Sequence, residues 1–164
     1  MSENLTANLP EFLKTVNTRH LFTMRLDVKA GVIIGQTPNG FKRATVVTGG
    51  IFDGDRLSGI VLDGGTDWQL VRPDHSVMLD VRLNLKTTDG ELISMAYKGI
   101  RTGAAEILKR VDAGEAVDPS TYYFRIIATF ETASPSYSWL NNIIAIGIGS
   151  RGATGPTYSL FELL

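Results

Sequence analysis

Carboxyl and aromatic side chains that could carry proton-transfer chemistry stand in several short, strand-like segments. Asp67 follows a glycine pair in "DGGTDWQ", and Glu131 lies near the end of "YYFRIIATFET". In a poorly hydrated pocket, Asp67 or Glu131 would serve as a general base, with Tyr97 as acid or hydrogen-bond donor. Arg101 would stabilise negative charge that develops on a substrate oxygen. We expect these four residues to be catalytic.

A second group of side chains could bind the substrate. Trp68 and Trp139 would form an apolar wall for an aromatic or polycyclic compound. Arg125 is an alternative to Arg101 for holding a carbonyl, carboxylate or phenolate oxygen. Such a site suits isomerisation, cyclisation, or the addition and elimination of water, and it could not readily perform redox chemistry. The residues predicted to bind substrate are Trp68, Asp80, Arg82, Arg125, Trp139, Asn141 and Arg151.

The composition excludes several classes of site. There are no cysteines, which rules out disulfides, thiolate metal sites and cysteine nucleophiles. The only two histidines, His20 and His75, are far apart and do not form a zinc-binding pattern. We therefore predict no metal and no cofactor. A net charge of −1 and scattered basic residues argue against binding to nucleic acid or to a membrane.

One glycine-rich stretch imitates a nucleotide-binding motif. The segment "GIGSRG", residues 147–152, matches the glycine spacing of dinucleotide-binding folds. That motif requires a helix to begin at the third glycine, but Gly155 and Pro156 follow at once and the sequence ends at Leu164. We interpret the stretch as a glycine-rich strand end.

Most of the chain has the period of half-buried strands. In "HLFTMRLDV" apolar and polar residues alternate, and "LNLKTTDGELISMAY" predicts a hairpin with Asp89 and Gly90 at its tip. Helical spacing occurs in "NLPEFLKTV" and over residues 102–115, where Thr102 could cap a helix and Gly114 could end it.

These elements predict an all-β, mainly antiparallel fold. We expect residues 1–18 to form a helical extension and residues 19–164 to form a single domain. That domain would be a closed or nearly closed barrel of about 8–10 strands with one short internal helix. An immunoglobulin-like sandwich is the alternative, but the internal helix and the long strands favour a barrel.

The polar faces of the strands are candidates for a ligand cavity. Arg125 and Glu131 stand among aromatic and apolar residues, where a solvated strand more often carries Lys, Thr or Ser. Burying them is costly unless they are paired or reserved for a ligand. We therefore expect the face that carries Tyr, Trp, Arg and Glu to line the lumen. The same pattern could instead form an internal ion-pair network that holds the barrel shut.

The glycine pair before Asp67 raises a question of orientation. Gly64 and Gly65 predict a turn at the barrel rim, after which Asp67 and Trp68 enter the next strand. Adjacent strand residues point to opposite faces, so both cannot line the lumen unless a bulge reorients one of them.

Several motifs together resemble a known family. They are "GGIFDGDRLSG", "GGTDWQ", "LDVRLNLKTTDG", "YKGIRTG", "YYFRIIATFET", "SWLNN" and the late Gly147 and Arg151. From about Leu21 to the C-terminus the sequence resembles the bacterial and fungal proteins grouped as domain of unknown function 3237. It departs from the family pattern at three turn positions, Asp55, Asp63 and His75. The resemblance implies a lipocalin-like barrel, commonly dimeric, with a central cavity, but it supplies no settled function.

Three functions are compatible with these observations. The first is a cofactor-independent acid/base enzyme of the isomerase, cyclase, hydratase or lyase type, acting on a hydrophobic, aromatic carbonyl compound. The second is a barrel that binds a hydrophobic small molecule and releases it unchanged. The third is a structural barrel with internally paired charges. We favour the enzyme. The apolar C-terminal "YSLFELL" is compatible with a homodimer, and the lack of a signal-peptide pattern predicts a cytoplasmic protein.

Overall fold

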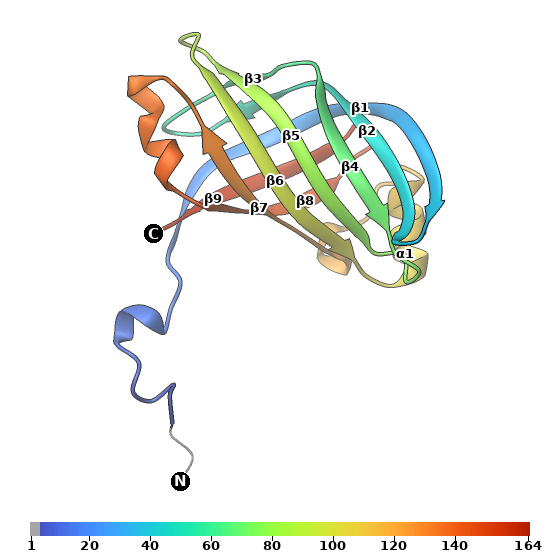
Figure 1. The fold of residues 1–164 in the computed structure, drawn as a ribbon, viewed down its shortest axis with the longest axis horizontal. Helices are drawn as coiled ribbons and strands as arrows, with labels where there is room; N and C mark the ends of the chain where they lie inside the picture. The colour runs from blue at the N-terminus through green and yellow to red at the C-terminus, as the bar shows by residue number, and fades with distance from the viewer. Residues whose placement is uncertain (1–3) are drawn as a thin grey trace.

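Nine antiparallel strands close into a barrel in the computed structural model, which describes residues 4–164. The ring runs β1-β9-β8-β7-β6-β5, continues through β3 and β4 to β2, and closes by the pairing of β2 with β1 (Figure 1). This confirms the predicted all-β barrel. The strands are β1 (Thr18–Thr37), β2 (Gly40–Asp53), β3 (Gly59–Val61), β4 (Gly65–Val71), β5 (Val77–Thr87), β6 (Leu92–Thr102), β7 (Tyr123–Glu131), β8 (Ala145–Arg151) and β9 (Pro156–Leu163).

The alternation within each strand separates the barrel core from its outer surface. On β5, Val81, Leu83 and Leu85 are buried, whereas Arg82 and Asn84 between them are exposed. Because successive strand residues point to opposite faces, the apolar set fills the interior. The predicted β5–β6 hairpin also forms, with Asp89 and Gly90 in the turn between the two strands.

The glycine pair before Asp67 lies midway along the barrel wall, where the strand hydrogen bonding is interrupted. Strands β3 and β4 occupy one position in the ring, because both pair with β2 and with β5. Residues 62–64 bulge between them, and Gly64 adopts a φ of +99°, which favours glycine. The prediction of a turn at the rim is therefore wrong: the chain continues along the same line after the bulge.

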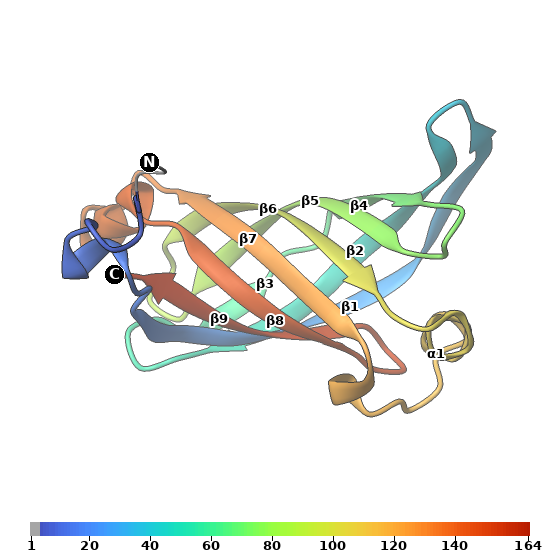
Figure 2. The same ribbon diagram turned by 90° about the horizontal axis from the view of Figure 1, so that it is seen from below.

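Helix α1 (Ala105–Asp112) lies at the end of the barrel opposite the chain termini (Figures 1 and 2). It forms inside the predicted range of residues 102–115 and buries Leu108 and Val111. The predicted cap is wrong, because Thr102 still belongs to β6 and Ala104 precedes the helix. Gly114 follows the helix with a φ of +78°, as expected of a residue that ends a helix.

The alternation in "YSWLNNIIAIGIG" predicts a strand that begins at Tyr137, but residues Pro135–Asn142 form a 3-10 helix, η3, so that prediction is wrong. The side chain of Asn141 explains the difference. Its Oδ1 accepts a hydrogen bond from the backbone N–H of Thr132 at 2.8 Å, and its Nδ2 donates to the Thr132 carbonyl at 3.0 Å. These two bonds satisfy backbone groups just past β7 and fold the segment back against that strand.

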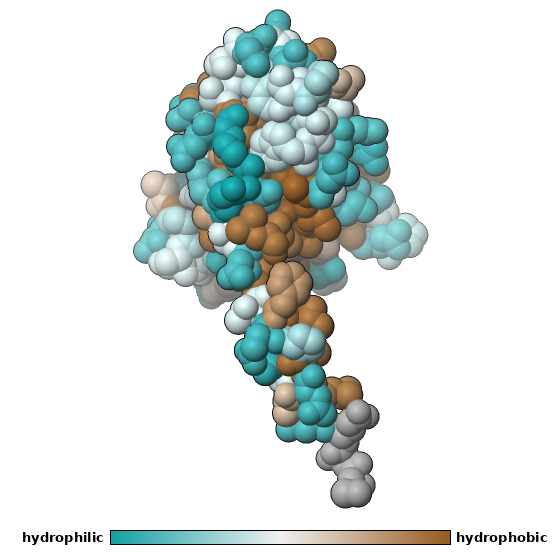
Figure 3. All heavy atoms as spheres, turned by 90° about the vertical axis from the view of Figure 1, so that its left-hand side faces the viewer, coloured by the Kyte–Doolittle hydropathy of each residue, from teal (hydrophilic) through white to brown (hydrophobic). Residues whose placement is uncertain are grey.

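The N-terminal segment projects from the barrel. Its only helical residues among those described are Glu11–Leu13, a single 3-10 turn, and β1 already begins at Thr18. Residues 1–3 of the predicted extension lie outside the described part. The apolar side chains of Phe12, Leu13 and Val16 are exposed. Figure 3 shows apolar surface gathered where this segment leaves the barrel.

The glycines of the nucleotide-like stretch leave space for core side chains. A Cβ atom at Gly149 would lie 2.7 Å from the ring of Phe124, and one at Gly147 would lie 2.5 Å from Ile126. Both neighbours are buried residues of β7. The spacing of these glycines therefore follows from packing between β7 and β8. Within residues 4–164, none of the helices has the length and apolar character needed to cross a membrane.

Candidate active site

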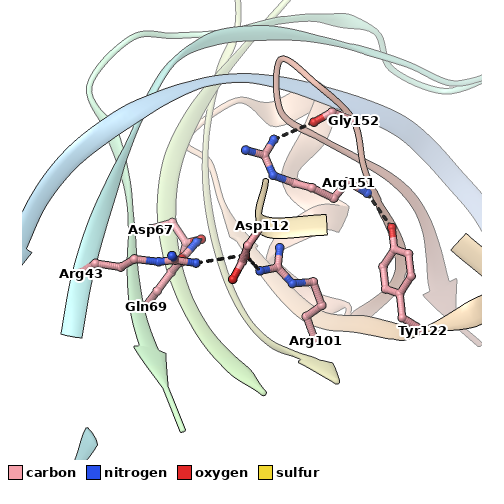
Figure 4. Close-up of polar contacts among 8 residues, drawn as sticks. All are labelled: Arg43, Asp67, Gln69, Arg101, Asp112, Tyr122, Arg151 and Gly152. Carbon is pink, nitrogen blue, oxygen red and sulfur yellow. Dashed lines mark hydrogen bonds and ion pairs between the residues drawn. The ribbon is translucent and has the colours of Figure 1, made fainter. Parts of the chain in front are cut away.

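A cavity of about 320 Å³ opens at the α1 end of the barrel. Its apolar side includes Leu26, Leu79, Tyr97, Phe124 and Tyr158, which belong to five different strands. Its polar groups come from β2, β4, β6, β8 and α1, and Figure 4 shows how they converge. They are Arg43, Asp67, Gln69, Arg101, Asp112 and Arg151.

The carboxyl group of Asp67 is buried in this cavity. Its cross-strand partners are Thr45 on β2 and Val81 on β5, and only 8% of the residue is exposed. One carboxyl oxygen, Oδ2, accepts a hydrogen bond from Gln69 Nε2 at 2.6 Å. The other oxygen, Oδ1, is buried and has no hydrogen-bond partner among residues 4–164. A ligand hydroxyl could supply the missing donor.

Burial sets the protonation of Asp67. It raises the pKa of this carboxyl from its ordinary value of 3.8 to about 6, although the hydrogen bond from Gln69 acts in the opposite direction. Removing the ionised form from water is costly, so the neutral form is favoured. A carboxyl with a pKa close to neutral can take up and release a proton in the physiological pH range, as general acid/base catalysis requires.

A chain of polar contacts orients Asp67 from the cavity mouth. Arg43 Nε donates to Gln69 Oε1 at 2.7 Å, which leaves the Gln69 amide nitrogen to face Asp67. The guanidinium of Arg43 also contacts Asp112 of α1, with Nη2 at 3.3 Å from Oδ1. The same Asp112 oxygen accepts a hydrogen bond from Arg101 Nη2 (Figure 4). Helix α1 is thereby tied to the barrel through two arginines.

Arg101 and Arg151 retain binding capacity. Arg101 is 4% exposed, and its Nε is buried without a hydrogen-bond partner in the described chain. Arg151 is half-buried, and within residues 4–164 its Nη1 donates only to the carbonyl of the next residue, Gly152, at 3.0 Å. Burial, together with the charge of Arg101, lowers the pKa of Arg151. An anionic or polarised ligand oxygen would satisfy these groups.

Three aromatic rings form the closed side of the cavity. Tyr158 packs edge-on against Tyr97 and Phe124, with ring centroids 5.4 and 5.3 Å apart. Burial raises the pKa of both Tyr97 and Tyr158, so both hydroxyls stay protonated at neutral pH. The two hydroxyls interact with each other and are surrounded by apolar surface.

The structure brings four of the predicted site residues together in this cavity: Asp67, Tyr97, Arg101 and Arg151. Trp68 lies on the opposite face of β4 and is 58% exposed. No register shift separates Asp67 from Trp68, because β4 keeps one register with β2 along its whole length. The bulge therefore precedes both residues and reorients neither.

The expectation that the polar strand faces line the lumen is wrong for β5 and β7. Asp80, Arg82, Arg125 and Glu131 all lie on the outside, because their neighbours in the chain are the buried apolar residues of β5 and β7. The guanidinium of Arg125 packs 4.8 Å from the Tyr123 ring centroid, on the outer surface. A barrel this narrow fills most of its interior with apolar side chains.

Three of the residues that were predicted to form the site line a separate groove of about 460 Å³ on the outside of the barrel: Arg82, Glu131 and Asn141. Trp139 lies instead at the end of the barrel near the termini, with its ring 4.1 Å from the Arg56 guanidinium carbon. Arg56 and Arg19 both bind the carboxylate of Glu162 there. The prediction placed these residues with Asp67, but they lie elsewhere.

Sequence reasoning missed several cavity residues with polar or aromatic side chains, among them Arg43, Gln69, Asp112 and Tyr158. Gln69 could have been found, because it stands two positions from Asp67 and strand alternation places both on one face. Asp112 and Arg43 give no local signal, since their meeting depends on how α1 docks across the barrel end.

Comparison with known proteins assigns the chain to a protein family. A family model described as "Protein of unknown function (DUF3237)" matches residues 16–163. A UPF0311 protein from Rhodopseudomonas palustris is 32% identical over 150 residues, which cover 92% of this chain and 98% of that protein. The crystal structure of a conserved protein from that species superposes with a TM-score of 0.87, at 32% identity and with 92% and 99% of the two chains covered.

Two further comparisons concern the barrel and a possible activity. A structure from Acinetobacter baumannii, described as a beta-barrel like protein, has a TM-score of 0.81 at 38% identity and covers 96% of this chain and 99% of its own. A protein from Penicillium herquei named hydroalkoxylation enzyme phnH is 28% identical over 131 residues, or 80% of this chain and 72% of that protein.

Proposed function

Because the chain belongs to the DUF3237 family and is 28% identical to a protein named hydroalkoxylation enzyme phnH, we propose that it is a cofactor-independent acid/base enzyme. Its substrate is a small aromatic carbonyl compound that carries a hydroxyl group and a conjugated double bond. The reaction is the addition of the hydroxyl to that double bond, or the reverse elimination. One observation carries the proposal: the buried Asp67 carboxyl keeps one oxygen unpaired and has a pKa of about 6.

The reaction begins at the unpaired oxygen of Asp67. Oδ1 accepts the hydroxyl proton as the substrate oxygen forms a bond to the alkene carbon farther from the carbonyl. The π electrons move to the carbonyl oxygen, and Arg101 stabilises the resulting enolate. The proton then returns from Asp67 to the carbon next to the carbonyl. All substrate atoms are retained and no electrons leave, so the step needs neither an oxidant nor a reductant.

The size and lining of the cavity support a compact, flat ligand. A volume of about 320 Å³ lies at the low end of the roughly 300–1,000 Å³ typical of ligand pockets. The rings of Tyr97, Phe124 and Tyr158 provide an apolar surface for an aromatic body. The unpaired polar atoms of Asp67 and Arg101 favour a ligand site over a purely structural role, in which such groups would be satisfied internally.

Incubation with 2′-hydroxychalcone, within a panel of aromatic ketones, enones and hydroxy-acids, tests the proposal. This compound contains the phenol, alkene and carbonyl that the reaction requires, and its cyclisation gives a flavanone. We expect accelerated conversion with an excess of one enantiomer, measured by chiral chromatography and mass spectrometry, because spontaneous cyclisation gives a racemate.

Asp67→Asn should abolish this conversion while changing ligand affinity by less than about tenfold. The matched control is Asp80→Asn, since Asp80 lies on the outer face of the adjacent strand β5. Equal turnover by Asp67→Asn and the wild type would remove Asp67 from the mechanism. Tight binding of panel members that all return unchanged would identify a small-molecule carrier in place of an enzyme.

A further inference from the structure

The cavity has a charge opposite to that of the whole chain. Four basic residues, Lys29, Arg43, Arg101 and Arg151, line it, against two acidic residues, Asp67 and Asp112. The chain as a whole has a formal net charge of −1. The excess of positive charge is therefore local, and it persists whether Asp67 is protonated or ionised.

Ion pairs within the described chain do not neutralise this positive charge. A single carboxylate oxygen, Asp112 Oδ1, receives both Arg43 and Arg101. Arg151 has no carboxylate within 4.0 Å among residues 4–164, and its guanidinium contacts only the Gly152 carbonyl. When Asp67 is neutral, Asp112 is thus the one ionised carboxylate in the described cavity lining against three arginines, and it pairs with only two of them. Leaving cationic groups half-buried without counter-charge is costly, which favours a ligand that brings an anion.

The unpaired donors come from β6 and β8, the strands on either side of β7 in the cavity wall. Arg101 Nε is buried and lacks a partner in the described chain, and Arg151 lies close enough for the two charges to repel. In Figure 4 the Arg101 guanidinium points toward Asp112, and the Arg151 guanidinium points toward Gly152. Tyr122 Oη accepts a hydrogen bond from the backbone N–H of Arg151 at 2.9 Å, which fixes this end of β8 without using the guanidinium.

We infer that Arg101 and Arg151 form an anion-binding subsite, and that the natural substrate carries a carboxylate or a comparably acidic oxygen there. The inference rests on the proposed function for the position of the reacting hydroxyl, which lies at Asp67. It adds a second anchor, so that the substrate is held by its anionic group while its hydroxyl meets the base. Guanidinium groups suit this role because their planar donors match the geometry of a carboxylate.

Calorimetric titration with two naphthalene probes of the same ring system tests the subsite. The probes are 6-hydroxy-2-naphthoate, which is anionic, and its methyl ester, which is neutral. We expect the acid to bind the wild-type protein at least about tenfold more tightly than the ester, with a preference that shrinks at high salt. Equal affinity for acid and ester, or no binding of either probe, would overturn the inference without any variant being needed.

Variants of Arg151 then test whether this residue causes the preference for the acid over the ester. Arg151→Met should reduce the acid-to-ester ratio to about one, and Arg151→Lys should restore part of it, because lysine keeps the charge but not the planar fork. The control is Arg125→Met, since Arg125 lies on the outer surface against Tyr123. A ratio that Arg151→Met leaves unchanged would contradict the subsite.

The same titration separates this inference from the proposed catalysis. Asp67→Asn should keep the preference for the acid even though it loses turnover. If the acid preference is present but no variant affects turnover of any panel compound, the subsite stands and the proposed reaction fails. If turnover depends on Asp67 but acid and ester bind alike, the reaction stands and the subsite fails.

Discussion

Gln69 and Asp67 lie two residues apart on β4 and meet inside the cavity, where the Gln69 amide nitrogen donates to Asp67 Oδ2 at 2.6 Å. The amide is oriented by Arg43, which donates to its oxygen at 2.7 Å. This arrangement directs one Asp67 oxygen toward the protein and leaves the other for a ligand. Gln69 therefore acts as a positioning residue for the proposed base.

Replacing Gln69 with leucine should move the pH dependence of activity to higher pH. The hydrogen bond from Gln69 lowers the pKa of Asp67, so its loss leaves burial less opposed and raises that pKa further above 6. Rates measured across pH should show the acid limb of the kcat/KM profile shifted upward. Asn84→Leu, on the exposed face of β5, is the control and should leave the profile in place. An unchanged acid limb in Gln69→Leu would contradict the positioning role.

The free energy of unfolding of Asp67→Asn, measured relative to that of the wild type, should increase as the pH rises. The unfolded chain releases the Asp67 proton near its ordinary pKa of 3.8, and the folded chain near 6. Between these values the folded state binds more protons, so wild-type stability falls as pH increases through the interval. The difference between the two pKa values corresponds to about 3 kcal/mol.

Urea unfolding between about pH 4 and pH 8 measures this effect. The free energy of unfolding of Asp67→Asn, relative to wild type, should increase by up to about 3 kcal/mol across that range. Asn84→Leu, at an exposed position of β5, should show no such trend, because it changes no ionisable group. A constant difference between Asp67→Asn and wild type would mean that burial does not perturb this carboxyl.

The charge of Asp112 should be needed to hold α1 against the barrel. Asp112→Asn leaves the buried Arg101 without its carboxylate, and we expect a loss of about 1–3 kcal/mol in the free energy of unfolding. In Asp112→Asn, the backbone amide hydrogens of α1 should also exchange faster than in the wild type, before those of the barrel strands are affected. Glu115→Gln is the matched control, since its ion pair with Arg110 is half exposed and contributes at most about 1 kcal/mol. Similar losses in both variants would argue against a special role for Asp112.

A methyl group at Gly149 should disturb the cavity wall. It would lie 2.7–3.0 Å from atoms of the Phe124 ring, which is buried and lines the cavity. We expect Gly149→Ala to lose about 1–3 kcal/mol of stability and to weaken binding of 2′-hydroxychalcone. Ser150→Ala, at the next and outward-facing position, should change neither. Wild-type stability in Gly149→Ala, measured by urea unfolding, would show that Phe124 has room to move.

The barrel itself was predictable because strand alternation is a local property. In β5 and β7 every second residue is apolar, and that pattern alone defines one buried face. The prediction of which strand face lines the lumen failed where it relied on the cost of burying charged residues. Arg125 and Glu131 lie on the outside, among exposed aromatic and apolar neighbours such as Tyr123 and Ile127.

Strand β4 shows why the site was only partly predictable. Its outward face carries the large Trp68, while its inward face carries Asp67 and Gln69, so the local pattern is the inverse of that in β5. Asp67 was identified as a carboxyl that follows a glycine pair and enters a strand. Asp112 could not be, because its position across the cavity depends on the docking of α1, which no short-range pattern encodes.

Carbon-detected NMR titration of the Asp67 side-chain carboxyl tests the central claim most directly. Selective assignment is obtained by comparison with Asp67→Asn, and the exposed Asp53 serves as an internal reference. A buried proton-transfer group should titrate with a midpoint of about 6. A midpoint at or below the ordinary value of 3.8 would mean that Asp67 is a solvated or ion-paired carboxylate, and it would contradict its role as the base.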